Sequence, residues 1–329
     1  MLENIEIVDY KCFKDFKLDG LSQINIISGG NNVGKTALLE ALFIERIAVE
    51  FISTEKFIDY TMSVISANRD IEKSDFYNYL TTINYFATSN SADIILKSKI
   101  KRELNELEIS KLEKKNRAYT DFIICKINDN LKVYPVDNII KVDDSVNYIN
   151  SSKPTTKILT KLYSYIQNKN IQPILLDYLK ILDKNISRVE PQLLNNQIQL
   201  RIEFETLKES FVISELGEGL SRYMEILIGI LGNFNGTVFI DEIENGIHYS
   251  KLKDIAKAII EIVQKENIQL FITTHDKETI EAFSEACEEL DFKDISSIEL
   301  YKDKENIIQS VVRNFEQFIA TVDAGMDIR

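Results

Sequence analysis

The chain has 329 residues, of which 44% are hydrophobic and 28% charged, proportions that are typical of a globular protein and argue against a disordered or fibrous one. Lysine and arginine number 39 against 52 aspartate and glutamate residues, a formal net charge of −13 that disfavours unaided, tight binding to nucleic acid. No apolar run reaches the roughly 18 residues of a membrane-spanning helix and no signal peptide is expected, so the composition predicts a soluble cytoplasmic protein without a membrane partner.

Cysteine and histidine usage argues against a disulfide framework and against a histidine-rich metal site. The three cysteines, Cys12, Cys125 and Cys287, are far apart, odd in number and without a CxxC pair, which is typical of reduced thiols. The chain has only two histidines, His248 and His275.

The first 50 residues predict strands followed by a helix. Alternating and apolar runs indicate strands around residues 5–8, 13–18 and 24–27. A helix is expected to begin near Lys35, because apolar residues recur at helical spacing as far as Ile47. Residues 50–90 have a weak pattern that is helical or irregular.

The middle of the chain predicts a strand-rich antiparallel subdomain and then helices. Residues 94–96 and 122–124 resemble strands, and residues 128–130 (NDN) are typical of a hairpin turn. The charged stretch 97–117 could instead form a helix. Residues 156–184 have the spacing of two helices, broken near Pro173.

The C-terminal third alternates short buried strands with amphipathic helices. Strands are expected over 197–213, 237–240 and 268–272, with helices after Gly219 and over 252–263. Such alternation predicts an α/β fold with a parallel sheet covered by helices.

A phosphate-binding loop is predicted where the third expected strand meets the first helix. Residues 29–36 (GGNNVGKT), here called the phosphate loop, fit the pattern GxxxxGK(S/T). Backbone N–H groups and the helix N-terminus would surround phosphate oxygens, Lys35 would reach the β- and γ-phosphates, and Thr36 would ligate Mg²⁺. The alternative is a glycine-rich turn with a chance lysine. The expected nucleotide-contacting residues here are Gly29, Gly30, Asn31, Asn32, Val33, Gly34, Lys35, Thr36 and Ala37.

Two further buried strands end in residues that could complete this chemistry. Asp241 and Glu242 follow the strand 237–240; Asp241 would hold Mg²⁺ and Glu242 would accept a proton from the attacking water. Their alternative role is to cap the following helix. His275 follows the next strand and would lie at the same sheet edge, where it could sense the γ-phosphate or orient the water, unless it is a capping or core histidine.

A glycine-containing turn precedes the helix that starts near Gly219. Residues 216–222 (LGEGLSR), here called the signature loop, could bind an anion at the helix N-terminus. Taken alone, a plain turn explains this segment better.

In this order, the elements resemble the ATPase head of the ABC superfamily, on its RecF, SMC and OLD side. Residues 5–13 (IEIVDYKCF) resemble the family's first strand, the phosphate loop its Walker A, residues 239–248 (FIDEIENGIH) its Walker B and D-loop, and residues 273–275 (TTH) its switch histidine. The resemblance implies an ABC-type P-loop ATPase head with a mixed sheet covered by helices, an antiparallel β-subdomain and an inserted helical lobe. It implies a single head over 1–329, with a Walker A lobe at 1–50, an inserted lobe at 51–195, and a lobe carrying signature, Walker B and switch histidine at 196–329.

The resemblance also implies a mechanism. Two heads form a homodimer around ATP and Mg²⁺, with Walker A of one subunit facing the signature loop of the other. Glu242, Lys35 and His275 would be catalytic, and Thr36 and Asp241 would bind the metal. Gly217, Gly219 and Arg222 would meet the partner's nucleotide, and Lys11 would contact nucleotide as well. Asn245 and His248 would lie near the interface, with helix capping an equal alternative for His248.

Two departures from the family pattern predict slow turnover. Gly217 occupies the place of the signature serine, for which Ser221 or Arg222 could substitute. No glutamine occurs between Gln23 and Gln167, so the Q-loop glutamine has no counterpart after Walker A.

Only 54 residues follow His275, too few for the Toprim nuclease domain of OLD proteins. The leading hypothesis is therefore an ATPase that controls a separately encoded effector, such as a nuclease or toxin, in anti-phage defence or DNA maintenance. A RecF-like DNA-binding protein and an ATP-locked scaffold with incidental hydrolysis are the alternatives. The DNA-binding alternative would use the basic residues Lys97, Lys99, Lys101, Arg102, Lys111, Lys114, Lys115 and Arg117, although interleaved glutamates favour a solvated face.

Overall fold

The computed structural model describes residues 1–51, 94–100, 103–112, 122–127, 130–135, 146–151, 156–194, 197–206, 209–233 and 235–326. The weak pattern expected over 50–90 therefore lies almost entirely outside the described residues. So do five of the eight basic residues considered for DNA binding: Lys101, Arg102, Lys114, Lys115 and Arg117.

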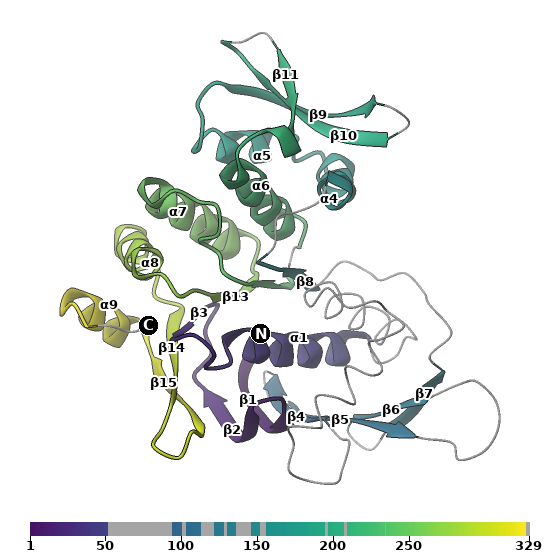
Figure 1. The fold of residues 1–329 in the computed structure, drawn as a ribbon, viewed down its shortest axis with the longest axis vertical. Helices are drawn as coiled ribbons and strands as arrows, with labels where there is room; N and C mark the ends of the chain where they lie inside the picture. Colours follow the sequence, from purple (N-terminus) through teal and green to yellow (C-terminus); the bar gives the residue numbers. More distant parts are fainter. Residues whose placement is uncertain are drawn as a thin grey trace.

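A six-stranded mixed sheet forms the centre of the molecule (Figure 1). Its order is β15–β14–β3–β13–β12–β8, and every neighbouring pair is parallel except β14 and β15. The strands are β3 (Ile24–Gly29), β8 (Val146–Ile149), β12 (Thr237–Ile240), β13 (Gln269–Thr273), β14 (Ile295–Lys302) and β15 (Ile308–Arg313). Every residue of β3, β12 and β13 is buried, as expected of parallel strands covered on both faces.

Helices cover both faces of this sheet. They are α1 (Lys35–Phe51), α7 (Tyr249–Lys265), α8 (Lys277–Glu289) and α9 (Phe315–Asp323). Figure 1 shows α1 between the central sheet and a second sheet, while α7 and α8 lie on the opposite face of the central sheet. The predicted α/β class is confirmed, and so are the strands and helices expected over 237–272.

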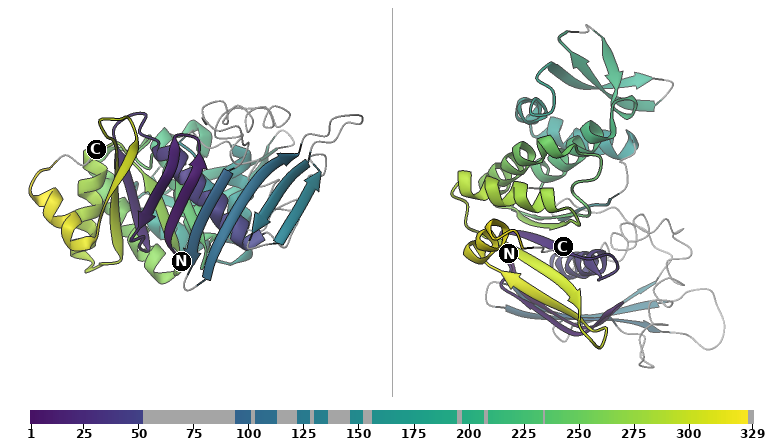
Figure 2. Two further views of the ribbon diagram at one scale, coloured as in Figure 1. Left: turned by 90° about the horizontal axis from the view of Figure 1, so that it is seen from below. Right: turned by 60° about the vertical axis from the view of Figure 1, so that its left-hand side comes forward.

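The second sheet is antiparallel and combines the N-terminal strands with the middle of the chain. Its order is β2–β1–β4–β5–β6–β7, and the left view of Figure 2 shows these strands side by side. The strands are β1 (Leu2–Tyr10), β2 (Phe13–Asp19), β4 (Ile94–Ile100), β5 (Glu103–Leu112), β6 (Phe122–Ile127) and β7 (Asn130–Pro135).

The charged stretch 97–117 forms strands wherever it is described, so its helical alternative is wrong there. In the β4–β5 register Lys97 stands opposite Glu106, a pairing of opposite charges that favours antiparallel strands. The hairpin predicted around 128–130 is confirmed by the pairing of Ile127 with Asn130 across β6 and β7.

A lobe of helices and a small sheet is inserted between β8 and β12. It contains α4 (Thr156–Asn168), α5 (Gln172–Leu179), β9 (Ile186–Leu194), β10 (Gln197–Phe204), β11 (Ser210–Val212), a 3₁₀ turn (Ile213–Glu215) and α6 (Glu218–Leu231). Pro173 lies in the first turn of α5, which confirms the expected helix break. Strands β8 and β9 were not predicted.

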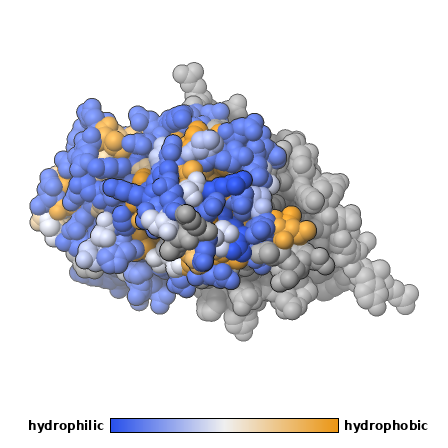
Figure 3. All heavy atoms as spheres, turned by 90° about the horizontal axis from the view of Figure 1, so that it is seen from above, coloured by the Kyte–Doolittle hydropathy of each residue, from blue (hydrophilic) through white to orange (hydrophobic). Residues whose placement is uncertain are grey.

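Helix α6 joins the lobe to the central sheet. All its residues from 221 to 231 are buried, and its apolar side chains belong to the same core as those of α5, β10 and β12. The right view of Figure 2 shows the lobe on one side of the head. Seen from above, hydrophilic residues cover most of the coloured surface, with apolar residues in small separate groups (Figure 3). None of the helices in the described part of the chain combines the length and apolar character that crossing a bilayer requires.

Candidate functional site

The phosphate loop has a backbone that only glycine permits at two positions. Gly29, the last residue of β3, has φ +138°, and a Cβ there would lie 2.3 Å from the carbonyl oxygen of Leu300. Gly34 has φ +97°, and a Cβ there would lie 2.8 Å from the Sγ of Cys12. Left-handed conformation and close approach both require glycine, so the motif glycines have a structural reason for their positions.

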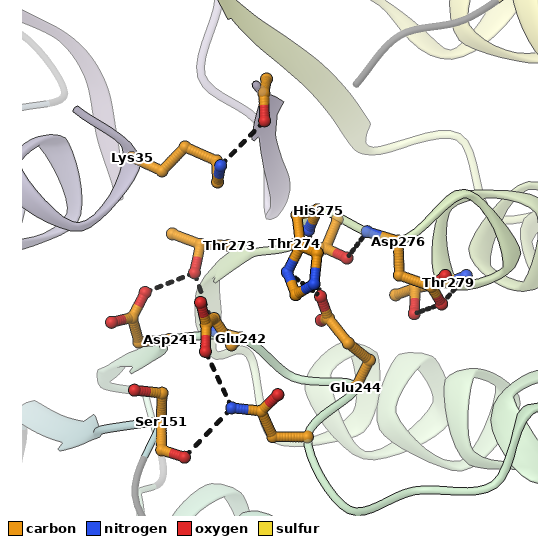
Figure 4. A network of polar contacts seen from close by, with 12 residues as sticks. Lys35, Ser151, Asp241, Glu242, Glu244, Thr273, Thr274, His275, Asp276 and Thr279 are labelled. Carbon is orange, nitrogen blue, oxygen red and sulfur yellow. Dashed lines mark hydrogen bonds and ion pairs between the residues drawn. The ribbon is translucent and has the colours of Figure 1, made fainter. Parts of the chain in front are cut away.

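Lys35, the first residue of α1, lies across this loop (Figure 4). Its Nζ donates hydrogen bonds to the carbonyl oxygens of Gly29 at 2.8 Å and Gly30 at 2.9 Å. Burial lowers the pKa of Lys35, against the pull of nearby carboxylates including Glu242. A partly desolvated ammonium held beside a helix N-terminus favours binding of an anion.

The carboxylate of Asp241 lies beside the hydroxyl of Thr36. The Oγ1 of Thr36 is 3.2 Å and 3.3 Å from the two carboxylate oxygens, although the residues are separated by most of the chain. Asp241 is buried, and burial raises its pKa. The Oγ1 of Thr273, at the end of β13, donates to Oδ1 of Asp241 at 2.5 Å.

Glu242 has a left-handed backbone that turns the chain sharply after β12. Its φ is +48°, and its N–H donates to Oγ1 of Thr273 at 2.8 Å. Its carboxylate accepts a 2.8 Å hydrogen bond from Nδ2 of Asn245, which also donates to the carbonyl oxygen of Ser151 at 3.1 Å. In Figure 4 the Glu242 carboxylate lies beside Asp241, and a dashed line joins it to the amide that also contacts Ser151.

His275 lies at the end of β13, at the same sheet edge as the phosphate loop and Asp241. Its Nδ1 is 2.9 Å from Oε1 of Glu244, and its backbone N–H donates to the same oxygen at 3.0 Å. The imidazole is half exposed, whereas Glu244 is mostly buried, which raises the pKa of that carboxyl. Glu244 therefore orients an imidazole that remains accessible.

The signature loop places its two glycines in different surroundings. Gly217, just before α6, is exposed, and a Cβ there would meet no atom of the described residues within 4 Å. A Cβ on Gly219 would lie 2.5 Å from the carbonyl oxygen of Gly246, in the loop after β12. Gly219 therefore allows the start of α6 to pack against that loop.

Arg222, which the resemblance places against a partner's nucleotide, points into its own protomer in this structure. Its guanidinium is buried, donates to the carbonyl oxygens of Asp241 and Asn150, and forms an ion pair with Glu225. Ser221 is also buried, and its Oγ donates to Ile213 at 3.0 Å. Both side chains are thus held by contacts within the protomer.

Lys11 and His248 have partners within their own protomer. The ammonium of Lys11 forms an ion pair with the buried carboxylate of Glu40 on α1, so its charge is already neutralised. His248 caps α7, because its Nδ1 accepts the N–H of Ser250. The capping alternative for His248 is therefore confirmed.

Known proteins resemble this chain in sequence and in fold. The family described as "AAA domain, putative AbiEii toxin, Type IV TA system" matches residues 24–281. The chain belongs to this AAA-domain family. An ATP/GTP phosphatase of Helicobacter pylori is 25% identical over an alignment 343 residues long. This alignment covers 89% of this chain and 90% of that protein.

Two SMC head structures share the fold of this AAA-domain protein. An SMC head bound to the C-terminal winged-helix domain of ScpA has a TM-score of 0.58 at 13% identity, covering 97% of this chain and 99% of that one. An SMC head with an extended coiled coil, bound to the C-terminal domain of ScpA from Pyrococcus furiosus, has a TM-score of 0.54 at 10% identity, covering 98% of each chain. The predicted fold of an ABC-superfamily ATPase head is confirmed.

Several residues that the AAA-domain head brings to this edge were missed in the sequence. Thr273 contacts both acids after β12, and Glu244 contacts His275. Residues 150–151 follow the unpredicted strand β8 and reach Arg222 and Asn245 through their carbonyl oxygens. Every residue has a backbone carbonyl oxygen, so the residue types do not show that these two carbonyls accept hydrogen bonds. The one available signal was that Asn150 and Ser151 follow a short, largely apolar run.

Proposed function

We propose that this protein is an ATP-hydrolysing switch whose active site is the sheet edge formed by the phosphate loop, Asp241, Glu242 and His275. The observation that carries the proposal is the 3.2 Å approach of the Thr36 hydroxyl to the Asp241 carboxylate. Two segments that are 205 residues apart in the sequence thereby supply oxygen atoms at one point beside the phosphate loop. This juxtaposition is what a nucleotide with a divalent cation requires.

The donor set fits Mg²⁺. A hydroxyl and a carboxylate are the hard oxygen ligands that Mg²⁺ takes, usually one or two from protein with the rest from phosphates and water. Thr36 and Asp241 would hold the ion, which when bound neutralises charge on the phosphate oxygens. Burial that raises the pKa of Asp241 also favours a cation beside it, because an isolated buried carboxylate is costly.

The protein's own residues divide the remaining work. Lys35 would exchange its contacts with the Gly29 and Gly30 carbonyls for phosphate oxygens. Glu242 would accept a proton from the attacking water, with its carboxylate held in place by Asn245. His275, oriented by Glu244, would donate a hydrogen bond to the terminal phosphate or the water.

Head-to-head dimerisation on ATP is part of the proposal. Gly217 is exposed at the N-terminus of α6, and none of the described residues comes within 4 Å of a Cβ placed there, which leaves room for a phosphate group of nucleotide held by a second copy. We also propose a separately encoded effector, such as a nuclease or toxin acting in anti-phage defence. The family description that names a toxin and the SMC heads bound to ScpA support this part of the proposal.

The test compares the wild type with Lys35→Ala and Glu242→Gln, using binding of a fluorescent ATP analogue, phosphate release and light scattering. Lys35→Ala should weaken nucleotide binding by about 10- to 100-fold, as loss of a charge-assisted contact predicts. Glu242→Gln should bind nucleotide normally, hydrolyse at least about 100-fold more slowly and accumulate as an ATP-bound dimer. Lys304→Ala, a change at an exposed lysine, is the matched control.

Equal hydrolysis by wild type and Glu242→Gln would overturn the catalytic assignment and favour an ATP-locked scaffold. Unchanged nucleotide affinity in Lys35→Ala would overturn the site itself.

A further inference from the structure

We propose that Arg222 is a positioning residue that transmits movement of helix α6 to the catalytic carboxylate Glu242. This inference rests on the proposed function, since it assumes that hydrolysis takes place at this sheet edge. Arg222 stands in the second turn of α6, five residues after Gly217, and so about 7.5 Å along the helix at 1.5 Å per residue.

The guanidinium of Arg222 joins the ends of two neighbouring strands. Nη1 donates to the carbonyl oxygen of Asn150, immediately after β8, and Nη2 donates to that of Asp241, immediately after β12, at 2.7 Å. A longer contact of 3.4 Å reaches the carbonyl oxygen of Glu242. Strands β8 and β12 are paired in the sheet, and their ladder continues as far as the bond from the Asp241 N–H to Ile149. Arg222 extends the connection beyond the point where the ladder ends.

Asn245 connects the same two segments from another position. Its Nδ2 donates to the carbonyl oxygen of Ser151 and to the carboxylate of Glu242, and Figure 4 shows Ser151 on the far side of that contact from Glu242. Residues 150–151 and 241–242 are thus cross-linked twice, once through backbone oxygens and once through the catalytic carboxylate. A shift of Asn150 and Ser151 must therefore be accompanied by a shift of Glu242.

The energetics indicate that this arrangement is more than packing. Arg222 is 3% exposed and Glu225 is its buried ion-pair partner at 3.0 Å. A buried ion pair gains little stability over apolar residues of similar size, because desolvation offsets the attraction. Its planar donors fix direction, however, and three carbonyl contacts from one fork define the orientation of α6 relative to the two strand ends.

The consequence is a mechanical route from the signature loop to the chemistry. Helix α6 is buried from residue 221 to residue 231, and Gly217 is exposed just before its first turn. Any contact that tilts α6 moves the guanidinium, and the carbonyl oxygens of Asp241 and Glu242 move with it. Contact at the signature loop would therefore change the rate of hydrolysis more than it changes nucleotide affinity.

The experiment uses the full-length protein with Arg222→Lys, which retains the charge but cannot form the fork, and the pair Arg222→Met with Glu225→Met, which removes both charges together. Arg188→Met is the control, because Arg188 is exposed in the lobe and pairs only with Glu190 among the described ion pairs. We measure kcat and KM for ATP, affinity for a fluorescent ATP analogue, and hydrogen exchange of residues 241–246 without nucleotide.

We expect both Arg222 variants to lose about tenfold or more in kcat while affinity changes by no more than about twofold. Amide exchange of residues 241–246 should be faster than in wild type and unchanged in Arg188→Met. Wild-type kcat and exchange in a folded Arg222→Lys protein would overturn the inference. If the wild type itself does not hydrolyse ATP, the proposed function fails, and the exchange measurement still decides whether Arg222 holds the strand end.

Discussion

The hydroxyl oxygen of Thr273, Oγ1, makes two hydrogen bonds to consecutive residues. It donates to Oδ1 of Asp241 at 2.5 Å and accepts the backbone N–H of Glu242 at 2.8 Å. One side chain on β13 thus connects the two consecutive acids that follow β12. Since β12 and β13 are parallel neighbours, this hydroxyl sets how the chain turns as it leaves the sheet.

Thr273→Val should therefore lower both stability and kcat. The substitution keeps the side-chain shape but leaves the Glu242 N–H without its acceptor and removes one of the two hydroxyl donors to Asp241. The expected cost is about 1–3 kcal/mol in free energy of unfolding. Urea denaturation and phosphate release measure the two effects. The control is Thr321→Val, which removes only a bond to Gln317 within α9. A stable variant with the wild-type rate would contradict the role assigned to this hydroxyl.

The two signature-loop glycines should respond differently to alanine. In Gly219→Ala the new Cβ would lie 2.5 Å from the carbonyl oxygen of Gly246, so the free energy of unfolding should fall by about 1–3 kcal/mol. In Gly217→Ala the Cβ has no neighbour within 4 Å in the part of the chain that the structure describes, so stability should remain close to that of the wild type.

If the protein dimerises as proposed, Gly217→Ala should nevertheless weaken ATP-dependent self-association. Light scattering measures this when Gly217→Ala is combined with Glu242→Gln, the variant expected to accumulate as a dimer. Equal stability of the two alanine variants would contradict the packing of α6 against the loop after β12.

Glu225 should make stability depend on pH. Burial raises its pKa from 4.5 to about 7, although the Arg222 guanidinium opposes the shift. Between these pH values the folded protein binds a proton that the unfolded chain releases, so the free energy of unfolding falls as pH rises, by up to about 3 kcal/mol from this group.

Glu225→Gln should flatten that part of the stability profile, measured by urea denaturation between pH 4.5 and pH 7. Glu288→Gln, at an exposed position on α8, should leave the profile unchanged. A profile of equal slope in wild type and Glu225→Gln would show that the buried pair does not titrate in this range.

The two histidines should separate catalysis from stability. His275→Gln removes a half-exposed imidazole, so kcat should fall by about tenfold with little change in melting temperature. His248→Ala removes the cap of α7, so stability should fall by about 1 kcal/mol with little change in kcat. Phosphate release and thermal denaturation of both variants test this, and a loss of kcat in His248→Ala alone would reverse the assignment.

Local patterns predicted three of the six central strands, β3, β12 and β13, because apolar residues fill most of their positions and the helices between them are amphipathic. Residues 238–240 and 270–272 are all apolar and all buried, so these runs are visible without knowledge of the fold. Strand β9 was missed because Pro191 interrupts its pattern, and β8 because four residues are too few to show a period. The charged residues of β5 obscured a strand whose pairing depends on β4 and β6.

The sequence by itself determined the phosphate loop, the acids after β12 and the histidine after β13, because each is a residue type placed where a buried strand ends. Only the tertiary structure decided which groups each side chain contacts. Arg222 turned inward to the carbonyl oxygens of Asn150 and Asp241, and Lys11 paired with Glu40. Every residue has the same backbone carbonyl acceptor, so the sequence does not show which carbonyl a side chain will contact. A charged side chain also has several oppositely charged residues in the sequence with which it could pair. Packing selects among these partners, because it decides which charged groups are buried away from water and must therefore be paired.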